Sequence, residues 1–251
     1  MHELRVETRR LLAWLDLCAP LLPASTVRSA YRRGRRLLKL FAPLRDTQVQ
    51  LQLVERQLQT FPVLADFRRK LARHERRLLA RAEHKLRRFK VATLMDRLDA
   101  VGRGLRRAFA NPAAARASVT AVQREAQAAF AETIARRQAV EADDPATVHR
   151  LRVAFKRLRY TLELLTPVLP RINAAMPRRM RAYQTRMGEL QDHEVLRRNL
   201  EEFAARQPAR ARKLDRFRSA VARQQTRRLQ RFLARADPLP DFRPPRLPKP
   251  Q

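Results

Sequence analysis

The stretch Val148–Leu165, VHRLRVAFKRLRYTLELL, decides the fold, because it reads as one helix with two different faces. At roughly 100° per residue, its apolar side chains fall within about 80° of one another, and its cations occupy a similar arc on the opposite side. The apolar face is Leu151, Phe155, Leu158, Leu162 and Leu165, and the basic face is His149, Arg152, Lys156 and Arg159. Like charges three and four residues apart weaken a helix, so this basic row costs least when a polyanion lies across it.

The same pattern occurs at the start of the chain, in MHELRVETRRLLAWLDL, residues 1–17. His149 follows His2 by 147 residues, and the shared pattern is H-x-L-R-V-x-x-(K/R)-R-L. Further on, APLRDTQV at 42–49 matches GELQDHEV at 188–195 with an offset of 146. That offset also pairs Arg77, Arg81 and Lys85 with Arg223, Arg227 and Arg231. Repetition over most of the chain predicts two structurally equivalent halves.

The composition favours helices throughout. Arg, Leu and Ala dominate, only 4 of the 251 residues are Gly, and no stretch alternates in the manner of a strand. We therefore predict an all-α fold of two pseudo-symmetric antiparallel helical bundles, forming one domain over 1–236 with halves of about 1–111 and 112–236. Pro43 is expected to break or kink the path before Leu44–Leu58. The proline-rich segment 237–251, DPLPDFRPPRLPKPQ, is expected to be an extended tail.

The two halves differ in how they begin. Before the second copy, a helix is expected over Ala113–Ala142, followed by Asp144 as N-cap and Pro145 at the first helical position. The first copy has neither feature, so we expect its bundle to lack the leading helix. The apolar groove left open would suit a partner chain, as in a homodimer.

The charge predicts a polyanionic partner. The formal net charge is +32, with 56 Lys+Arg against 24 Asp+Glu, and self-repulsion of this size burdens a compact state. Nucleic acid, an acidic membrane and a phosphate polymer are the candidate partners, and a merely solvated surface is the alternative. No apolar run approaches the ~20 residues of a membrane span, and the chain begins as a charged amphipathic helix. A cytoplasmic protein that does not bind membranes is therefore expected.

The motifs resemble those of a known family. Paired HxLRVxxxRLR-type helices, each followed some forty residues later by a G-x-L-x-D-x-x-V segment, resemble the CHAD domain, the conserved histidine α-helical domain. The resemblance extends to about Ala236 and implies two four-helix bundles with a basic channel or surface between them. It further implies that this surface binds inorganic polyphosphate, and association with polyphosphate granules is a related expectation. The first copy departs from the pattern with Ala42-Pro43 in place of Gly and Leu12 in place of Arg159, so the second copy is expected to bind more strongly.

The candidate polyphosphate-binding residues are basic and histidine side chains, most of them matched between the halves. A phosphate chain offers no base or apolar group, so recognition depends on charge-assisted hydrogen bonds, which suit the fork of Arg. A histidine beside phosphate has its pKa raised, because the opposite charge favours the charged form. For any single Arg or His, a solvated surface position is the alternative. The candidates are His2, Arg5, Arg9, Arg10, Arg35, Arg77, Arg81, Lys85, His149, Arg152, Lys156, Arg157, Arg159, Arg181, Arg223, Arg227 and Arg231.

The matched acids Asp46 and Asp192 have two open interpretations. Either they orient an Arg or a His of the basic faces, or they serve as plain N-cap or surface residues.

The sequence does not favour an enzyme, a metal site or a cofactor site. It contains no HExxH, no GxxxxGK[ST] and no ExExK motif, whereas phosphoryl transfer normally needs metal-holding carboxylates or a phosphate loop. Cys18 is the only cysteine, which excludes an internal disulfide, and it is expected in the core. We predict a binding protein without catalytic residues.

Non-specific nucleic-acid binding is the alternative function. A charge of +32 attracts nucleic acid at low salt. However, single-strand binders use exposed aromatic platforms, and Trp14, Phe67, Phe155 and Phe217 fall on predicted apolar faces. No RRM, KH, zinc-finger or bZIP pattern is present, so we expect nucleic-acid binding to be weak and secondary.

Overall fold

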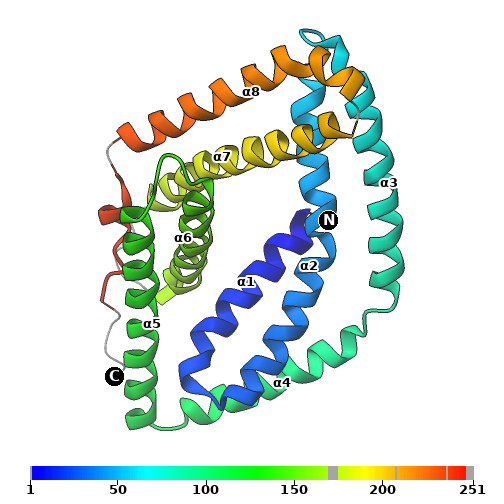
Figure 1. The fold of residues 1–251 in the computed structure, drawn as a ribbon. Coiled ribbons are helices and arrows are strands. Elements are labelled where there is room, and N and C mark those ends of the chain that lie inside the picture. The colour runs from blue at the N-terminus through cyan, green and yellow to red at the C-terminus, as the bar shows by residue number, and fades with distance from the viewer. Residues whose placement is uncertain (1, 169–174, 207, 236, 247–251) are drawn as a thin grey trace.

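The computed structural model describes residues 2–168, 175–206, 208–235 and 237–246, and within them the chain is helical with no strand (Figure 1). The predicted all-α fold is confirmed. The α-helices are α1 (His2–Cys18), α2 (Ala24–Glu55), α3 (Ala65–Arg87), α4 (Val91–Ala108), α5 (Pro112–Gln138), α6 (Pro145–Leu165), α7 (Met176–Ala205) and α8 (Pro208–Ala234). Short 3-10 turns are η1 (Ala19–Leu21), η2 (Pro62–Leu64), η3 (Thr166–Val168) and η4 (Leu239–Phe242).

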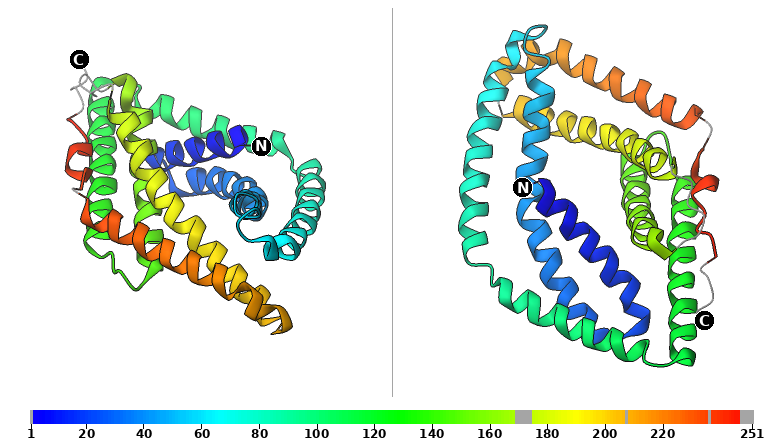
Figure 2. Two further views of the ribbon diagram at one scale, coloured as in Figure 1. Left: turned by 90° about the horizontal axis from the view of Figure 1, so that it is seen from above. Right: turned by 180° about the vertical axis from the view of Figure 1, so that it is seen from behind.

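The helices repeat in order, as the sequence offsets predict. In the first half α1 packs on α2 and α2 on α3, and in the second half α6 packs on α7 and α7 on α8. The halves meet where α1 lies against α6 and α2 against α7. In both views that face the molecule, α1, α2, α6 and α7 lie inside a frame formed by α3, α4, α5 and α8 (Figures 1 and 2). The four inner helices carry the repeated motifs.

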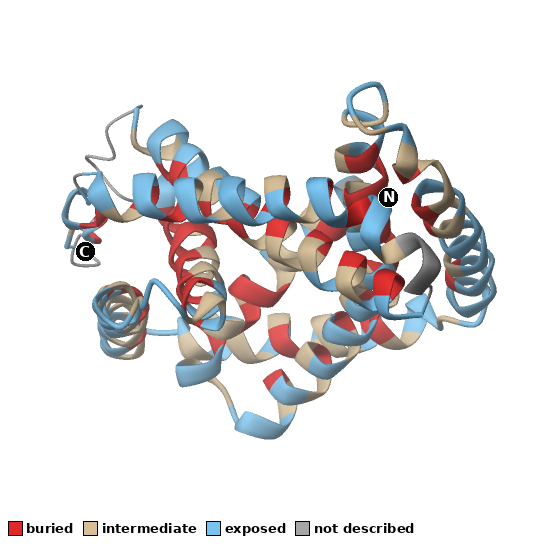
Figure 3. Cartoon of the chain, turned by 45° about the horizontal axis from the view of Figure 1, so that its top comes forward, coloured by how far each residue is buried: buried red, intermediate tan, exposed pale blue. Residues whose placement is uncertain are grey.

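The apolar face predicted for 148–165 forms the centre of the second bundle. Leu151, Phe155 and Leu158 are fully buried on α6, in one cluster with α5, α7 and α8. The start of α6 is also as predicted, because the Asp144 carboxylate accepts a hydrogen bond from the Ala146 amide at 2.9 Å. Burial of each such side chain contributes roughly 1.5–3 kcal/mol. Figure 3 shows the buried positions gathered where the helices meet.

The two halves also share a core. Leu51 on α2 and Phe67 on α3 belong to the same buried cluster as Leu200 on α7 and Phe217 on α8. A further cluster joins α1 and α2 to Val101 of α4, so α4 closes the first bundle, and it includes the predicted core residue Cys18. Packing across the halves therefore fixes the relative positions of the four inner helices.

Pro43 was expected to break or kink the chain, and the structure shows that the helix is not broken there. The helix α2 continues from Ala24 to Glu55 with Pro43 inside it. A proline removes one helical hydrogen bond, but Phe41 and Leu44 on either side are buried against α3. Tertiary packing on both flanks outweighs the local preference of one residue.

The tail differs from its description as an extended appendage. Leu239 and Phe242 are each 0 % exposed and belong to the core of the second bundle. Asp241 pairs with Arg179, and Asp237 pairs with Arg137 at 3.0 Å. The prolines prevent a regular helix, yet two apolar side chains on one short turn still dock. Residues 247–251 of the predicted tail lie outside the described residues.

The two repeated helices differ in how deeply they are covered. Leu151 is 0 % exposed beneath α5, whereas its repeat counterpart Leu4 is 37 % exposed on α1. Matched positions of the two halves are therefore covered to different depths. The missing leading helix and the homodimer stay predictions.

Candidate polyanion-binding site

A pocket of about 460 Å³ lies where the inner helices α1, α2, α6 and α7 meet. We call it the central pocket. Cations and acids from both halves line it, and the cations are in excess. The basic lining residues are Arg5, Arg9, Arg45, His149 and Arg152, and the acidic ones are Asp46, Glu189 and Asp192.

Repeat-matched side chains converge on this pocket. Arg5 and Arg152 occupy equivalent positions on α1 and α6, and Asp46 and Asp192 occupy equivalent positions on α2 and α7. The internal repeat thus produces an approximately symmetric site at the junction of the halves. This convergence is the strongest structural sign of function in the described chain.

Arg5 is held rigidly at the first-half side. Its side chain is buried, and Nη1 donates a hydrogen bond to the Phe41 carbonyl oxygen at 2.7 Å. Burial, reinforced by the charge of Arg9 and opposed by Asp46, lowers the pKa of Arg5 to about 10. The guanidinium remains charged at neutral pH, and the nearby Asp46 offsets its burial and the repulsion from Arg9 only in part.

Arg152 is the counterpart on α6. Burial lowers its pKa, and the charge of Asp192 opposes that effect. Its Nε is buried without a hydrogen-bond partner, which leaves a donor unsatisfied beside the pocket. A Cβ at Gly188 would lie 3.7 Å from Arg152 Nε, so the Gly of the G-x-L-x-D-x-x-V segment packs directly against this guanidinium.

Lys156 lies beside the pocket and has the most strongly shifted pKa among its cations. Burial, followed by repulsion from Arg152, Arg9 and Arg5, lowers the pKa of Lys156 to about 7. An ammonium group among three guanidinium groups is thus only partly protonated at neutral pH. A bound anion would favour its charged form and raise the pKa.

Two of the three acids of the pocket, Asp46 and Asp192, are not engaged in ion pairs with described residues. Among the described residues, neither Asp46 nor Asp192 has a cationic nitrogen within 4 Å. Burial raises the pKa of Asp192, and the charges of Arg152 and Arg45 oppose this shift. The hypothesis that these acids orient a basic residue stays a prediction. Among the charged neighbours of Asp192, Arg152 has the largest effect on its pKa.

The second-half histidine reaches the pocket, as proposed. His149 is exposed, and its Nδ1 lies 3.0 Å from Oε1 of Gln191 on α7. The side chain of His2, its counterpart on α1, lies outside the described residues.

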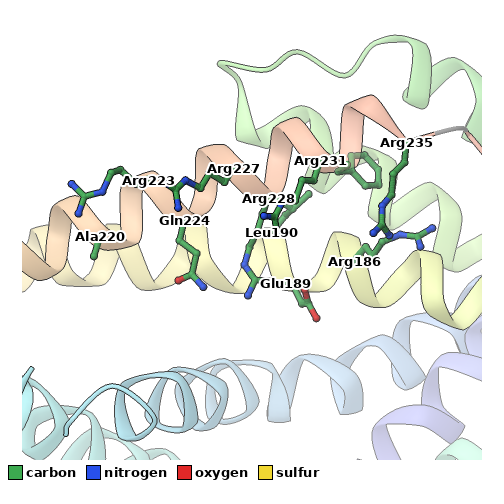
Figure 4. A pocket seen from close by; sticks show the side chains of 11 residues that line it. Arg186, Glu189, Leu190, Ala220, Arg223, Gln224, Arg227, Arg228, Arg231 and Arg235 are labelled. Carbon is green, nitrogen blue, oxygen red and sulfur yellow. Dashed lines mark hydrogen bonds and ion pairs between the residues drawn. The ribbon is translucent and has the colours of Figure 1, made fainter. Parts of the chain in front are cut away.

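A second basic depression, which we call the α7–α8 groove, adjoins the central pocket (Figure 4). It has a volume of about 610 Å³ and contains the predicted residues Arg223, Arg227 and Arg231. Arg228 pairs with Glu189, the residue that lines both depressions. Arg223, Arg227 and Arg231 form no ion pair with any described residue. One polyanion crossing α7 at Glu189 would therefore meet cations on both sides.

Other candidate residues lie elsewhere. Arg77, Arg81 and Lys85 are exposed on α3 and line neither the central pocket nor the α7–α8 groove. Arg35 and Arg181 are also exposed outside these two depressions. Arg10 is paired with Glu7 at 2.7 Å on α1. These positions stay candidates for an extended surface, but the fold does not bring them to the central pocket.

Two arginines of the central helix are occupied by carboxylates. Arg157 pairs with Glu125 and Glu132 of α5. Arg159 is buried, donating from Nε to Gln184 at 2.9 Å and from Nη1 to Glu163 at 2.5 Å. Both side chains thus have partners that hold helices together.

Sequence reasoning missed several basic residues of these sites. Arg45 lines the central pocket, and Arg186, Arg228 and Arg235 line the α7–α8 groove. Arg45 precedes Asp46 as Gln191 precedes Asp192, and both positions face the pocket. The offset of 146 superposes Arg45 on Gln191, so the repeat could have identified Arg45 even though the two residues differ in type.

Two absences are findings about the described residues. They contain no group of three His, Cys, Asp or Glu side chains placed to hold a metal ion. None of the described helices combines the length and apolar character needed to cross a membrane.

The fold and the site define a class of protein: all-helical, built from two repeated halves, with a basic pocket at their junction. The family model of the CHAD domain matches residues 1–201 and again residues 126–249. The chain belongs to the CHAD domain family. The two overlapping matches agree with the internal repeat.

A solved structure shows the same fold. The crystal structure of the CHAD domain from the plant Ricinus communis matches with a TM-score of 0.68 and 23% sequence identity, covering 93% of this chain and 79% of that chain. No curated protein matches the sequence.

Proposed function

We propose that this protein binds inorganic polyphosphate without catalysing its conversion. The observation that carries the proposal is the convergence of matched cations from both halves: Arg5, Arg9 and Arg152 line one pocket, and Lys156 lies beside it. Each exposed ion pair contributes under about 1 kcal/mol, so affinity depends on many contacts acting together. A linear polymer that crosses the central pocket and the α7–α8 groove makes such contacts at several positions along its length.

The chemistry of the site favours inorganic polyphosphate over nucleic acid as the ligand. Phe67, Phe155 and Phe217 are buried in the cores, and neither depression presents an exposed ring for base stacking. Guanidinium forks and an ammonium group bind phosphate oxygens without reading a base. Non-specific binding of nucleic acid follows from the same charge and should fade with salt.

A binding role agrees with the absence of a phosphate loop or ExExK motif from the sequence. A protein of this kind would accompany its ligand in the cytoplasm, with polyphosphate granules as the expected location.

A competitive titration tests the proposal. Long-chain polyphosphate, single-stranded DNA and double-stranded DNA are titrated at equal phosphate concentration and physiological salt. We expect polyphosphate to bind at least about tenfold more tightly, because counterion-driven binding of nucleic acid weakens steeply with salt. Equal or tighter binding of DNA would make this a general polyanion binder and contradict the proposal.

A further inference from the structure

A third cavity lies in the first half, between α2 and α4, and no sequence motif pointed to it. It has a volume of about 270 Å³ and is lined by Ser29, Arg32, Arg33, Arg36 and Arg97. Four of its five lining residues are arginines and none is acidic. We call it the α2–α4 cavity.

Two of its arginines are fixed by contacts to the backbone. Arg33 donates from Nη2 to the Lys90 carbonyl oxygen at 2.9 Å, and its guanidinium lies 4.6 Å from the centre of the Phe89 ring. Arg97 donates from Nη1 to the Ser29 carbonyl oxygen at 3.0 Å. The cavity wall is therefore organised before any ligand arrives, which reduces the ordering cost of binding.

The positive charge of this cavity is uncompensated. None of its four guanidinium groups forms an ion pair in the described part of the chain, and Asp96 and Asp99 of α4 do not line it. Nε of Arg33 is also buried without a hydrogen-bond partner. Arg32 and Arg36 are one helical turn apart, where like charges repel. Converging cations with an unsatisfied donor make this cavity a candidate anion-binding site.

The second half does not repeat this arrangement. Arg179, which matches Arg33, pairs with Asp241, and Ala182 stands where the first half has Arg36. The cavity depends on α4, which has no counterpart packed in the same way among the described helices of the second half. It is a feature of this bundle and not a copy of the central pocket.

We propose that the α2–α4 cavity binds a compact phosphate anion, at a site separate from the central pocket. Arginine forks match the oxygens of a tetrahedral phosphate group, and the volume suits one such group better than an extended chain. The group has two sources with the same chemistry, free orthophosphate and the terminal unit of a short polyphosphate.

The test uses the full chain in calorimetric titrations with orthophosphate and, separately, tripolyphosphate. The variant Arg32→Gln/Arg36→Gln removes two exposed cations that form no hydrogen bond to the described side chains, and it leaves the contacts of Arg33 and Arg97 intact. We expect orthophosphate affinity to fall by about tenfold or more, because charge-assisted hydrogen bonds are lost. The control Arg28→Gln/Arg103→Gln removes the same charge from exposed positions of α2 and α4 outside the cavity, and it should change affinity by less than about twofold.

Three outcomes would overturn the proposal: no saturable orthophosphate binding by the wild type, equal losses in both double variants, or loss only when the central pocket is altered by Arg9→Gln/Lys156→Gln. Titration with long-chain polyphosphate distinguishes phosphate binding in the α2–α4 cavity from polyphosphate binding at the central pocket. The α2–α4 variant should retain long-chain binding, which the central-pocket variant loses. Tighter binding of tripolyphosphate than of orthophosphate would identify the chain terminus as the ligand, and the reverse would identify free phosphate.

Discussion

Lys156 connects the electrostatics of the central pocket to a measurable pH dependence. Burial and the surrounding arginines lower its pKa to about 7, so in the free protein it loses its proton as the pH rises through neutrality. Bound phosphate favours the charged ammonium and raises this pKa, so binding above about pH 7 takes up a proton. Because binding takes up this proton, the affinity for polyphosphate falls as the pH rises above about 7.

We predict that affinity for long-chain polyphosphate falls by about tenfold between pH 6.5 and 8.5, because protonating Lys156 costs more as the pH rises above its pKa. Calorimetry in buffers of different ionisation enthalpy measures the proton uptake directly. Lys156→Arg keeps the charge at every pH and should flatten this dependence. His149→Gln controls for the exposed imidazole. An unchanged pH slope in Lys156→Arg would contradict the role given to Lys156.

At the scale of single residues, the repeat and the helical wheel each selected some side chains that line the central pocket and some that do not. Matching the halves selected Arg5, Arg152 and Asp192, which line the central pocket. The wheel also placed Arg159 on the basic face, but it is buried with Glu163 and Gln184. A wheel gives direction about one axis and cannot tell which neighbouring helix covers that direction.

At the scale of the element, α6 and α1 share a sequence pattern, but their matched residues are buried to different depths. Leu158 is fully buried in the second core, whereas its repeat counterpart Leu11 is only partly buried in the first. The free energy of unfolding lost on truncation depends on the atoms removed and on the cavity left behind.

We therefore predict that Leu158→Ala lowers the free energy of unfolding by about 2–5 kcal/mol, whereas Leu11→Ala costs roughly 1 kcal/mol. Urea denaturation followed by circular dichroism measures both. The two variants remove the same atoms from matched positions, so each is a control for the other. Equal losses would show that α1 and α6 are covered to the same extent.

Helix α2 shows where local sequence signals fail. Pro43 predicted a break or a kink, yet α2 is not broken there, because buried residues on both sides hold the helix against α3. The existence and order of the helices followed from periodicity and repetition. The continuity of α2 depended on contacts with a helix distant in the sequence, which no local pattern contains.

At the scale of the whole molecule, a net charge of +32 must be carried by one compact fold. The outer helices spread much of this charge over exposed surface, where salt screens it within about 10 Å at 0.1 M. The central pocket instead concentrates cations from both halves where burial limits screening. If total charge determined binding, every cation would contribute to a similar extent. If local arrangement determines it, the cations of the central pocket contribute most.

The arrangement of the whole molecule could be predicted only in part. The repeat implied two halves, the family resemblance implied a basic surface between them, and the central pocket lies where the halves meet. The docking of Leu239 and Phe242 and the α2–α4 cavity could not be predicted, because none of the repeated motifs includes the residues that form them. Both features arise from packing between segments far apart in the chain.

The most direct measurement is the polyphosphate affinity of Arg9→Gln/Lys156→Gln, which removes one matched cation from each half. Neither side chain forms a hydrogen bond or ion pair with a described residue, and removing them relieves repulsion, so the fold should be retained. The control Arg116→Gln/Arg124→Gln removes equal charge from exposed positions of α5. The account predicts at least about a tenfold loss of affinity for the pocket variant, with a contribution from each single substitution, and less than about a twofold loss for the control. Equal losses in the two variants would mean that net charge alone binds the polymer, and they would contradict a site built from both halves.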